Sequence, residues 1–495
     1  MAKTPMDRGR SAMPRPIING VPTIDRPDHN KPDGANLPPR AMGLGDLVLF
    51  YVVTGVSLRW IATAAAAGPS AVVIWIIAWL GFFAPLALSV IELSSRYPQE
   101  GGLYVWSKRA FGDFAGFISA WTYWTSNLPY FPAILYFAAG NALFIGGHRW
   151  WGLSGNARYF LLFSLLALAL VALVNVLGLD IAKWLHNLGA LGLWLPAMIL
   201  IVMGIVAWLR FGSATHFTLA GLVPSTKLKD IVFWSTLAFA FGGCETASFM
   251  GEEIRQARRN IPRGLLAAGL TMTIVYMGGT ICVLLALPQS EVTGLEGIMQ
   301  AIVKTGERLG FSTVIPIAAA LIALGQLGAA GGYLAATARL PFVAGIDRFL
   351  PAAFGKLHPR WRTPYVALLT QTICGAVFVF LGQAGTSVKG AYDVLVSMGV
   401  ITYFIPYLFL FAAMLRLQRE PAGPEVIRVP GGKPVAVALA MLGFATTVVT
   451  IILALIPPPD EVNKALAVAK VVGLTGLLVA AGVGTYRLGK RRAFQ

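Results

Sequence analysis

Charged residues are scarce in this sequence. Asp, Glu, Lys and Arg make up 12% of its 495 residues, whereas soluble proteins carry about 25%. Hydrophobic residues reach 56%, and the mean hydropathy is +0.69. A chain of this composition cannot cover a folded surface in water, and it is too apolar to be disordered. A soluble multidomain protein is therefore excluded, and a polytopic membrane protein is indicated.

Cysteine and histidine are also rare, with three and five residues. Cys244, Cys282 and Cys374 each lie in an apolar stretch, and none forms a CxxC motif or a zinc-ligand spacing with histidine. This excludes a disulfide scaffold and a Cys/His metal site, so we interpret the cysteines as small core residues. No motif implies a cofactor, and no cluster of nucleophile, acid and metal ligands suggests an integral membrane enzyme.

Hydrophobic runs, by contrast, are abundant. Each run is bounded by turn residues or charges and is long enough for a membrane-spanning helix, which needs ~20 residues. The runs cover residues 44–67, 70–93, 112–144, 157–178, 181–209, 229–256, 264–288, 311–345, 364–383, 391–415, 434–457 and 463–486. Backbone groups find no water in hydrocarbon, so each run must be a helix or a helix whose break is sheltered by protein. The sequence therefore predicts an all-α polytopic membrane protein with twelve transmembrane helices.

The basic residues predict the orientation of these helices. The chain has 39 Lys and Arg against 22 Asp and Glu, and most of the basic residues fall before the first run, after the last run or in every second loop. Cytoplasmic loops are rich in Lys and Arg. We therefore expect both termini to be cytoplasmic, with a disordered tail over residues 1–42 and a short C-terminus over residues 488–495. The positive charge then needs no nucleic acid to explain it.

Two of the predicted spans carry an interruption near their middle. The first contains Thr54, Gly55 and Ser57, and the sixth, five spans later, contains Gly242-Gly243. Interrupted helices at matching positions of two halves indicate a transporter site near the bilayer midplane. A half-helix N-terminus favours a carboxylate and freed carbonyls favour an ammonium, so one site would hold both ends of an α-amino acid. The alternative is that these small residues only allow close helix packing.

Three strings of the sequence carry a family resemblance, and they read ELSSRYPQEGGLYVWSKRAFG (92–112), FAFGGCETASFMGEEIRQARRNIPRG (239–264) and RVPGG (428–432). They resemble the amino acid, polyamine and organocation permease superfamily. Within it the chain is most similar to bacterial amino acid exchangers, including the glutamate and GABA antiporters. The resemblance implies a LeuT-like fold. Residues 43–210 (spans 1–5) and 228–416 (spans 6–10) would form inverted repeats, and residues 432–487 would add two peripheral helices.

The resemblance also implies the residues of a substrate site. The family's first-span motif is Gly-Ser-Gly followed by two apolar residues, and this chain has Thr54-Gly55-Val56 there, followed by Ser57. In the sixth span, the matching segment of the family binds the substrate amino group through its carbonyls and closes an aromatic side chain over the ligand. That segment consists here of Phe239, Ala240, Phe241, Gly242 and Gly243.

Three polar residues inside the spans are candidates for coupling or gating. Glu245 is a carboxylate at membrane depth, where burial disfavours the charged form. We expect it either to gain and lose a proton during transport or to brace the two half-helices. Tyr123 lies near a tyrosine that lines the central pathway of the family. For Arg59, contact with an acidic substrate side chain, pairing with a carboxylate such as Glu245 and a position in the outer vestibule all stay open.

Two departures from the family bear on the coupling mode. Proton-coupled relatives place a lysine in the fifth span, where no ionisable residue lies between His186 and Arg210. Sodium-coupled relatives place hydroxyls in the eighth span, where this chain reads GQLGAAGGY. Exchange or another proton route is therefore favoured. The basic loop Arg255–Arg263 is interpreted as an orientation signal, or as part of an inner gate with Glu252 and Glu253.

Together these observations predict a secondary active transporter. It would move amino acids or closely related amines across the cytoplasmic membrane by alternating access, as an exchanger or a proton-coupled permease. The alternatives are a proton-coupled permease for polyamines or organocations, and a transporter-derived sensor or channel without flux coupling. The expected partners are a small amino acid and the lipid bilayer, while protons and a homodimer stay open. No cofactor and no nucleic acid are expected.

Overall fold

The computed structural model describes residues 38–288, 291, 297–383, 388–456 and 464–493. The chain divides into two units, Met1–Leu37 and Pro38–Gln495, and all of the described residues belong to the second. They are helical apart from turns and one isolated parallel bridge between Met42 and Ile254. The prediction of an all-α fold is thus confirmed for this part of the chain. Residues 1–37 of the predicted tail (residues 1–42) lie outside the described residues.

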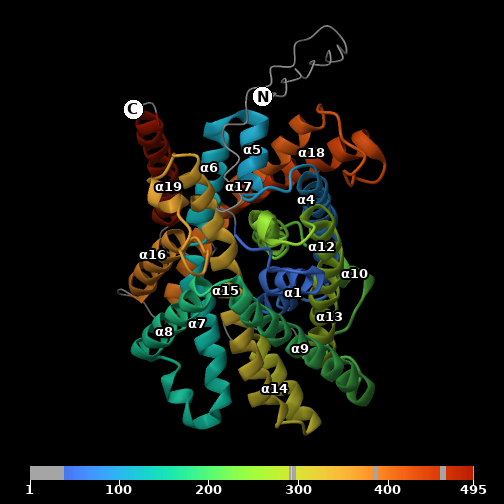
Figure 1. Cartoon of the computed structure of the whole chain (residues 1–495). Helices are drawn as coiled ribbons and strands as arrows, with labels where there is room; N and C mark the ends of the chain where they lie inside the picture. Colours follow the sequence, from blue (N-terminus) through green and yellow to red (C-terminus); the bar gives the residue numbers. More distant parts are fainter. Residues whose placement is uncertain (1–37, 289–290, 292–296, 384–387, 457–463, 494–495) are drawn as a thin grey trace, which may run out of the picture. The chain divides into compact units, whose positions relative to one another are not determined.

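The helices before residue 225 include two long uninterrupted helices, over Ala157–Val176 and Leu179–Phe211, and several that are broken by short turns or by changes of helix type. They are α1 (Leu44–Gly55), α2 (Arg59–Ala65), α3 (Ser70–Ala78), the π-helix η2 (Trp79–Phe83), α4 (Ala84–Arg96), α5 (Leu103–Phe111), α6 (Asp113–Ser126), α7 (Tyr130–Ala142), the 3-10 turns η3 (Leu143–Ile145), η4 (Gly147–Arg149) and η5 (Trp151–Leu153), α8 (Ala157–Val176), α9 (Leu179–Phe211) and α10 (Leu219–Leu222). Figure 1 shows their arrangement.

The helices after residue 225 begin with a second broken segment. They are α11 (Leu228–Phe239), the 3-10 helix η6 (Thr246–Glu253), α12 (Ala257–Thr273), the π-helix η7 (Ile274–Gly278), α13 (Gly279–Ala286), α14 (Gly297–Leu309), α15 (Val314–Ile346), η9 (Ala352–Gly355), α16 (Tyr365–Gln383), α17 (Val388–Leu417), α18 (Gly432–Ala454) and α19 (Lys464–Ala493). The third predicted span, residues 112–144, also differs from a single rod, because a turn at residues 127–129 separates α6 from α7.

Seven helices in the described residues are long and apolar enough to cross a membrane, and the bent pair α1 and α2 makes an eighth. The predicted count of twelve is not reached by this criterion. Three shorter apolar stretches lie within α11, α16 and α17, over Asp230–Phe239, Tyr365–Leu381 and Thr402–Leu417, and are not counted among these spans. The chain is therefore a helical membrane protein with seven or more spans, and the number twelve stays a prediction.

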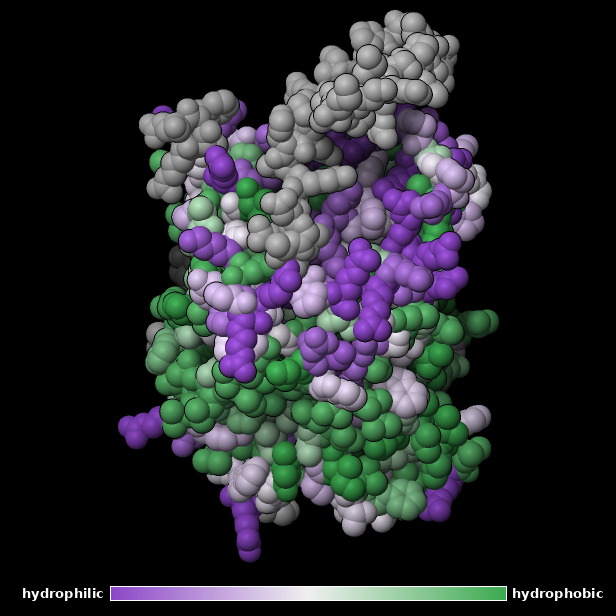
Figure 2. Space-filling view, in the orientation of Figure 1, coloured by the Kyte–Doolittle hydropathy of each residue, from purple (hydrophilic) through white to green (hydrophobic). Residues whose placement is uncertain are grey.

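The outside of the helical bundle is largely apolar. On α8, Leu162, Leu166, Leu170 and Leu173 are all exposed, and their spacing of three or four residues places them on one helix face. Figure 2 shows apolar residues over a broad zone of the visible surface, while hydrophilic residues gather towards one end. Exposed apolar area of this extent marks a surface that faces lipid.

Small residues allow α9 and α15 to pack closely. A Cβ atom on Gly189 would lie 2.5 Å from the Cα of Gly328, and one on Gly192 would lie 2.8 Å from the backbone nitrogen of Gly325. Gly325 and Gly328 of the eighth predicted span thus allow close packing of the two helices. Together with α12, these two helices contact α1, which lies inside the bundle.

A buried carboxylate connects two of the strings that carry the family resemblance. One oxygen of Glu92 accepts hydrogen bonds from the Arg96 guanidinium at 2.6 Å and from the Gln418 amide at 2.6 Å. Its other oxygen accepts from the Val429 backbone N–H at 2.9 Å. Glu92 is 1% exposed, so its charge needs these partners. They fix the segment 419–431 against the end of α4.

A more exposed ion pair lies beside this carboxylate. Glu420 accepts a hydrogen bond from the Tyr97 hydroxyl at 2.7 Å and one from Arg109 at 3.0 Å. Burial alone would raise the pKa of Glu420, but the hydrogen bonds from Tyr97 and Arg109 outweigh it and lower this pKa from its ordinary value. The pair joins the segment after α17 to α5.

Candidate functional site

The first broken segment lies between α1 and α2. The two helices are bent by 46°, and Val56 between them has extended backbone angles (φ −95°, ψ 122°) that end the helical hydrogen-bond ladder. The carbonyls released by the break accept hydrogen bonds from tyrosines. The Thr54 carbonyl accepts from the Tyr333 hydroxyl at 2.7 Å, and the Gly55 carbonyl accepts from the Tyr276 hydroxyl at 2.8 Å.

The second broken segment follows α11. Residues 240–245 form turns, and the chain continues as the 3-10 helix η6. Gly243 has φ +100°, a conformation that L side chains rarely adopt. A Cβ atom there would also lie 2.8 Å from the Tyr333 hydroxyl oxygen and 2.9 Å from the Thr54 carbonyl oxygen. Both the backbone angle and the lack of space therefore require glycine at position 243. The two predicted breaks contact each other at this point.

The hydroxyl of Tyr276 connects the two breaks. It accepts a hydrogen bond from the Ser57 backbone N–H at 3.0 Å. Its single hydrogen is shared between the carbonyls of Gly55, at 2.8 Å, and Ala240, at 3.0 Å. The tyrosine lies on η7, and its ring stacks on that of Trp75 with centroids 5.0 Å apart and planes 2° from parallel. Its position is therefore set by packing as well as by hydrogen bonds.

Glu245 lies at the end of the second break and is 0% exposed. Three tyrosine hydroxyls converge on its Oε1 atom: Tyr123 at 2.5 Å, Tyr407 at 2.9 Å and Tyr403 at 3.4 Å. Its Oε2 atom is buried and has no hydrogen-bond partner among the described residues. One oxygen is therefore held as an acceptor, while the other is the atom that a proton would occupy.

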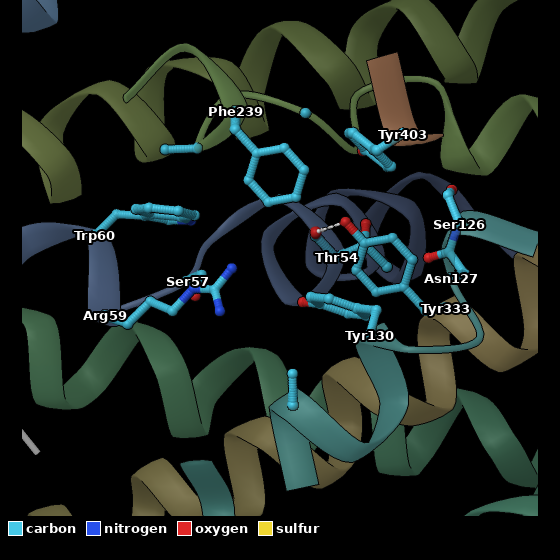
Figure 3. A pocket seen from close by; sticks show the side chains of 14 residues that line it. Thr54, Ser57, Arg59, Trp60, Ser126, Asn127, Tyr130, Phe239, Tyr333 and Tyr403 are labelled. Atoms are coloured by element: carbon cyan, nitrogen blue, oxygen red, sulfur yellow. Dashed lines mark hydrogen bonds between the residues drawn. The ribbon is translucent and has the colours of Figure 1, made fainter. Parts of the chain in front are cut away.

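The two breaks border a pocket, which Figure 3 shows with its lining side chains. The cavity volume is about 40 Å³, which is enough for a few water molecules. The pocket is lined by Thr54, Gly55, Ser57, Arg59, Trp60, Ser126, Asn127, Tyr130, Ala133, Phe239, Ala240, Gly242, Tyr333 and Tyr403. An amino acid would therefore enter only if some of these side chains moved aside.

Aromatic rings form much of the pocket wall. Phe239 makes edge contacts with Trp60 at 5.7 Å and with Tyr403 at 4.9 Å between ring centroids. Tyr130 makes an edge contact with Tyr333 at 5.0 Å. Tyr403 both lines the pocket and donates a hydrogen bond to Glu245, so the buried carboxylate lies one side chain away from the cavity.

The structure brings most of the expected substrate residues together. Thr54, Gly55, Ser57, Phe239, Ala240 and Gly242 line the pocket, as does Arg59. The others lie beside it. Val56 is buried, Phe241 packs against Trp75 and Tyr276, and Gly243 packs against Thr54. Tyr123 does not line the pocket but contacts Glu245.

Several residues that line the pocket or contact the two breaks were not expected from the sequence. Tyr276, Tyr333 and Tyr407 lie within long apolar runs, as do Trp60 and Tyr130. The sequence offers only a general rule for finding them, which is that a tyrosine hydroxyl at membrane depth needs a hydrogen-bond partner inside the protein. That rule selects the tyrosines but not their partners.

A second buried polar cluster lies near the end of η6. The Arg339 guanidinium makes a bidentate pair with Glu253 at 2.7 and 2.9 Å, and its Nε atom is 4.0 Å from Glu100. All three residues are buried. Burial and the Glu253 carboxylate raise the pKa of Glu100 well above its ordinary value, and Arg339 opposes this effect. Glu253 thus pairs with Arg339 and not with the basic loop Arg255–Arg263.

The neighbouring backbone ties the beginning of the first broken span to the end of η6. The Met42 N–H donates to the Glu253 carbonyl at 3.2 Å, and the Arg255 N–H donates to the Met42 carbonyl at 2.9 Å.

In the basic loop, Arg258 pairs with Glu425 at 2.5 Å. The described residues contain no group of three or more His, Cys, Asp or Glu that would hold a metal ion. Cys244 and Cys282 are buried and Cys374 is partly buried.

Comparison with known proteins gives a consistent result. Residues 41–478, which include both breaks, match the model of the family described as amino acid permease. Similar proteins include an uncharacterized transporter of Legionella pneumophila (28% identity over 85% of this chain and 90% of that protein). The probable agmatine/putrescine antiporter AguD of Lactococcus lactis is 24% identical over 80% of this chain and 84% of its own length. The serine/threonine exchanger SteT of Bacillus subtilis is 24% identical over 87% and 92%.

Proposed function

Because the chain belongs to the amino acid permease family, we propose that it is a secondary active transporter that moves amino acids across the cytoplasmic membrane by alternating access. The family and the similar proteins are transporters, so the chain is a multi-pass membrane transporter and not an enzyme. The observation that carries the proposal is the meeting of two helix breaks at one pocket. Amino acids are favoured as substrates because such a site offers both carbonyls and polar donors.

The substrate ammonium would bind at the released carbonyls. Those of Thr54, Gly55 and Ala240 already accept tyrosine hydroxyls, but a carbonyl oxygen has two lone pairs and can accept a second donor. Phe239, at the end of α11, contacts Trp60 and Tyr403 across the pocket. We infer that movement of this ring opens and closes the site.

We also propose the twelve-span fold with two inverted repeats, residues 43–210 and 228–416, followed by peripheral helices over residues 432–487. Matching irregularities support this division. The first segment of each proposed repeat is broken, at residues 56–58 and 240–245. The second segment of each contains a π-helix, Trp79–Phe83 and Ile274–Gly278. Irregularities at two equivalent positions favour a repeat over chance.

For coupling, we propose that Glu245 takes up and releases a proton. Three hydroxyl donors on Oε1 stabilise the carboxylate, and the unpartnered Oε2 accommodates the proton. Tyr403 relays the state of the carboxylate to the pocket that it lines. The transporter would then act as a proton-coupled permease, or as an exchanger if substrate return is the faster step. We also propose that both termini lie in the cytoplasm, because Lys and Arg concentrate at the two ends of the chain and in every second loop.

A permease for polyamines is the second candidate, because one similar protein is described as an agmatine/putrescine antiporter. Counterflow distinguishes the two. The purified full-length chain is reconstituted into liposomes that are preloaded with one amino acid or polyamine each, and uptake of the same labelled compound is measured. We expect accumulation driven by preloaded amino acids. Accumulation driven only by polyamines would replace the proposal with the second candidate, and binding without flux would indicate a sensor.

A further inference from the structure

Arg59 is the only charged side chain among the described residues that line the pocket. It is the first residue of α2, directly after the first break. Its guanidinium carbon lies 4.4 Å from the centroid of the Trp60 ring. In Figure 3 the side chain extends into the pocket, between Trp60 and Tyr130. A permanent positive charge therefore borders the space that the substrate would occupy.

Three main-chain donors near the first break are already engaged. The Val56 N–H donates to the Val52 carbonyl at 2.9 Å, and the Ser57 N–H donates to the Tyr276 hydroxyl at 3.0 Å. The Trp60 N–H donates to the Ser57 carbonyl at 3.1 Å. An anionic group of the substrate would have to displace these contacts to bind any of these three N–H groups.

Four main-chain donors of the second break are engaged as well. The N–H groups of Ala240, Phe241 and Gly242 donate to carbonyls at the end of α11 at 3.1 to 3.2 Å, and that of Gly243 donates to the Tyr407 hydroxyl at 3.4 Å. Arg59 supplies a positive charge at this pocket, and this charge attracts a carboxylate. A guanidinium binds a carboxylate through two parallel N–H groups, which gives strength and orientation.

We propose that Arg59 binds a carboxylate of the substrate and thereby determines specificity, so that carboxylate-free amines are rejected. This inference rests on the proposed function. The carboxylate has two sources, the α-carboxylate of any amino acid or the side chain of a dicarboxylic amino acid. In either case a compound that carries only ammonium groups would bring like charge next to Arg59, which disfavours it. The pocket therefore fits amino acids better than the polyamines named for one similar protein.

The test measures counterflow and competition with Arg59→Gln and Arg59→Lys. Unlabelled glutamate, serine and putrescine compete against the labelled amino acid that the wild type transports best. In the wild type we expect glutamate or serine to compete and putrescine not to compete. Arg59→Gln is expected to raise KM at least about tenfold, as for loss of a charge-assisted contact. Arg59→Lys keeps the charge but loses the planar fork, so its KM should lie between the two.

A matched control is Arg308→Gln. Arg308 also stacks on an aromatic ring, with its guanidinium carbon 4.5 Å from the Phe211 centroid, but it does not line the pocket. Its removal should leave KM unchanged. Elution as a single peak in detergent separates misfolding from lost binding, and if Arg59→Gln aggregates, the KM of Arg59→Lys decides.

The outcomes separate the two proposals. A loss in Arg59→Gln that is larger for glutamate than for serine assigns the contact to a side-chain carboxylate, and an equal loss assigns it to the α-carboxylate. Unchanged KM and unchanged ranking in both variants, or wild-type competition by putrescine as strong as that by serine, would overturn the inference while leaving transport intact. If no amino acid drives counterflow in the wild type, the proposed function fails, and the inference fails with it.

Discussion

Replacing Tyr276 with phenylalanine would remove a hydroxyl that contacts both helix breaks. The change deletes its hydrogen bonds with the Ser57 N–H and with the carbonyls of Gly55 and Ala240. The phenylalanine ring keeps the stacking contact with Trp75. The variant therefore tests the hydrogen bonds at the breaks with little change in packing volume.

The size of the effect follows from these contacts. A neutral hydrogen bond contributes about 1 kcal/mol net to stability, and a buried donor left without a partner costs about 1–3 kcal/mol. The hydroxyl accepts one bond and donates one, so we expect Tyr276→Phe to lower the free energy of unfolding by about 2–3 kcal/mol. The breaks would also be less ordered before the substrate binds. If roughly half of the loss falls on binding, KM rises about tenfold, since about 1.4 kcal/mol corresponds to a factor of ten.

The assay combines thermal unfolding in detergent with substrate-dependent counterflow. Tyr136→Phe is the matched control, because the buried Tyr136 hydroxyl donates to the Val379 carbonyl at 2.7 Å and lies outside the pocket lining. Both variants should be destabilised, but only Tyr276→Phe should raise KM. An unchanged KM in Tyr276→Phe, or an equal rise in both variants, would refute the role of this hydroxyl in shaping the site.

Three further predictions concern single residues. Gly243→Ala should abolish transport and cost about 1–3 kcal/mol of stability, because its φ is +100° and its Cβ would lie 2.8 Å from the Tyr333 hydroxyl. The control Gly310→Ala, at φ +79° with open space around it, should keep uptake. Equal uptake by both variants would contradict the argument. Glu245→Gln should remove the pH dependence of uptake without unfolding the protein, because an amide does not titrate; an unchanged pH profile in proteoliposomes would count against a coupling role. The folded-state pKa of Glu420 lies below its ordinary value of 4.5, so its contribution to stability is present above that value and is lost as the pH falls through the lowered pKa. Glu420→Gln should therefore reduce the loss of thermal stability at acid pH, and an identical acid profile would exclude this contribution.

Hydropathy and turn residues predict the helices and the two breaks because both signals are local. The runs 157–178 and 181–209 match α8 and α9 within two residues at each end, and the Gly242-Gly243 pair lies within the observed turn at residues 240–245. The turn at residues 127–129 was missed although Asn127 and Pro129 stand there, because the apolar run continues on both sides of it. The two π-helices have no local signal, since they depend on how the neighbouring helices pack.

The polar contacts of the site could not be predicted, because they join residues far apart in the chain. Tyr276 contacts Gly55 across 221 positions, and Tyr333 contacts Thr54 across 279. Local pattern also misdirects the choice of ion-pair partner. The basic loop Arg255–Arg263 is next to Glu253 in sequence, yet Glu253 binds Arg339, which is 2% exposed. A buried guanidinium is costly without a carboxylate, whereas a loop arginine keeps its water. The buried arginine, for which the unpaired state costs more free energy, therefore binds the buried carboxylate. Buried tyrosine hydroxyls also need hydrogen-bond partners, and three of them donate to one oxygen of Glu245.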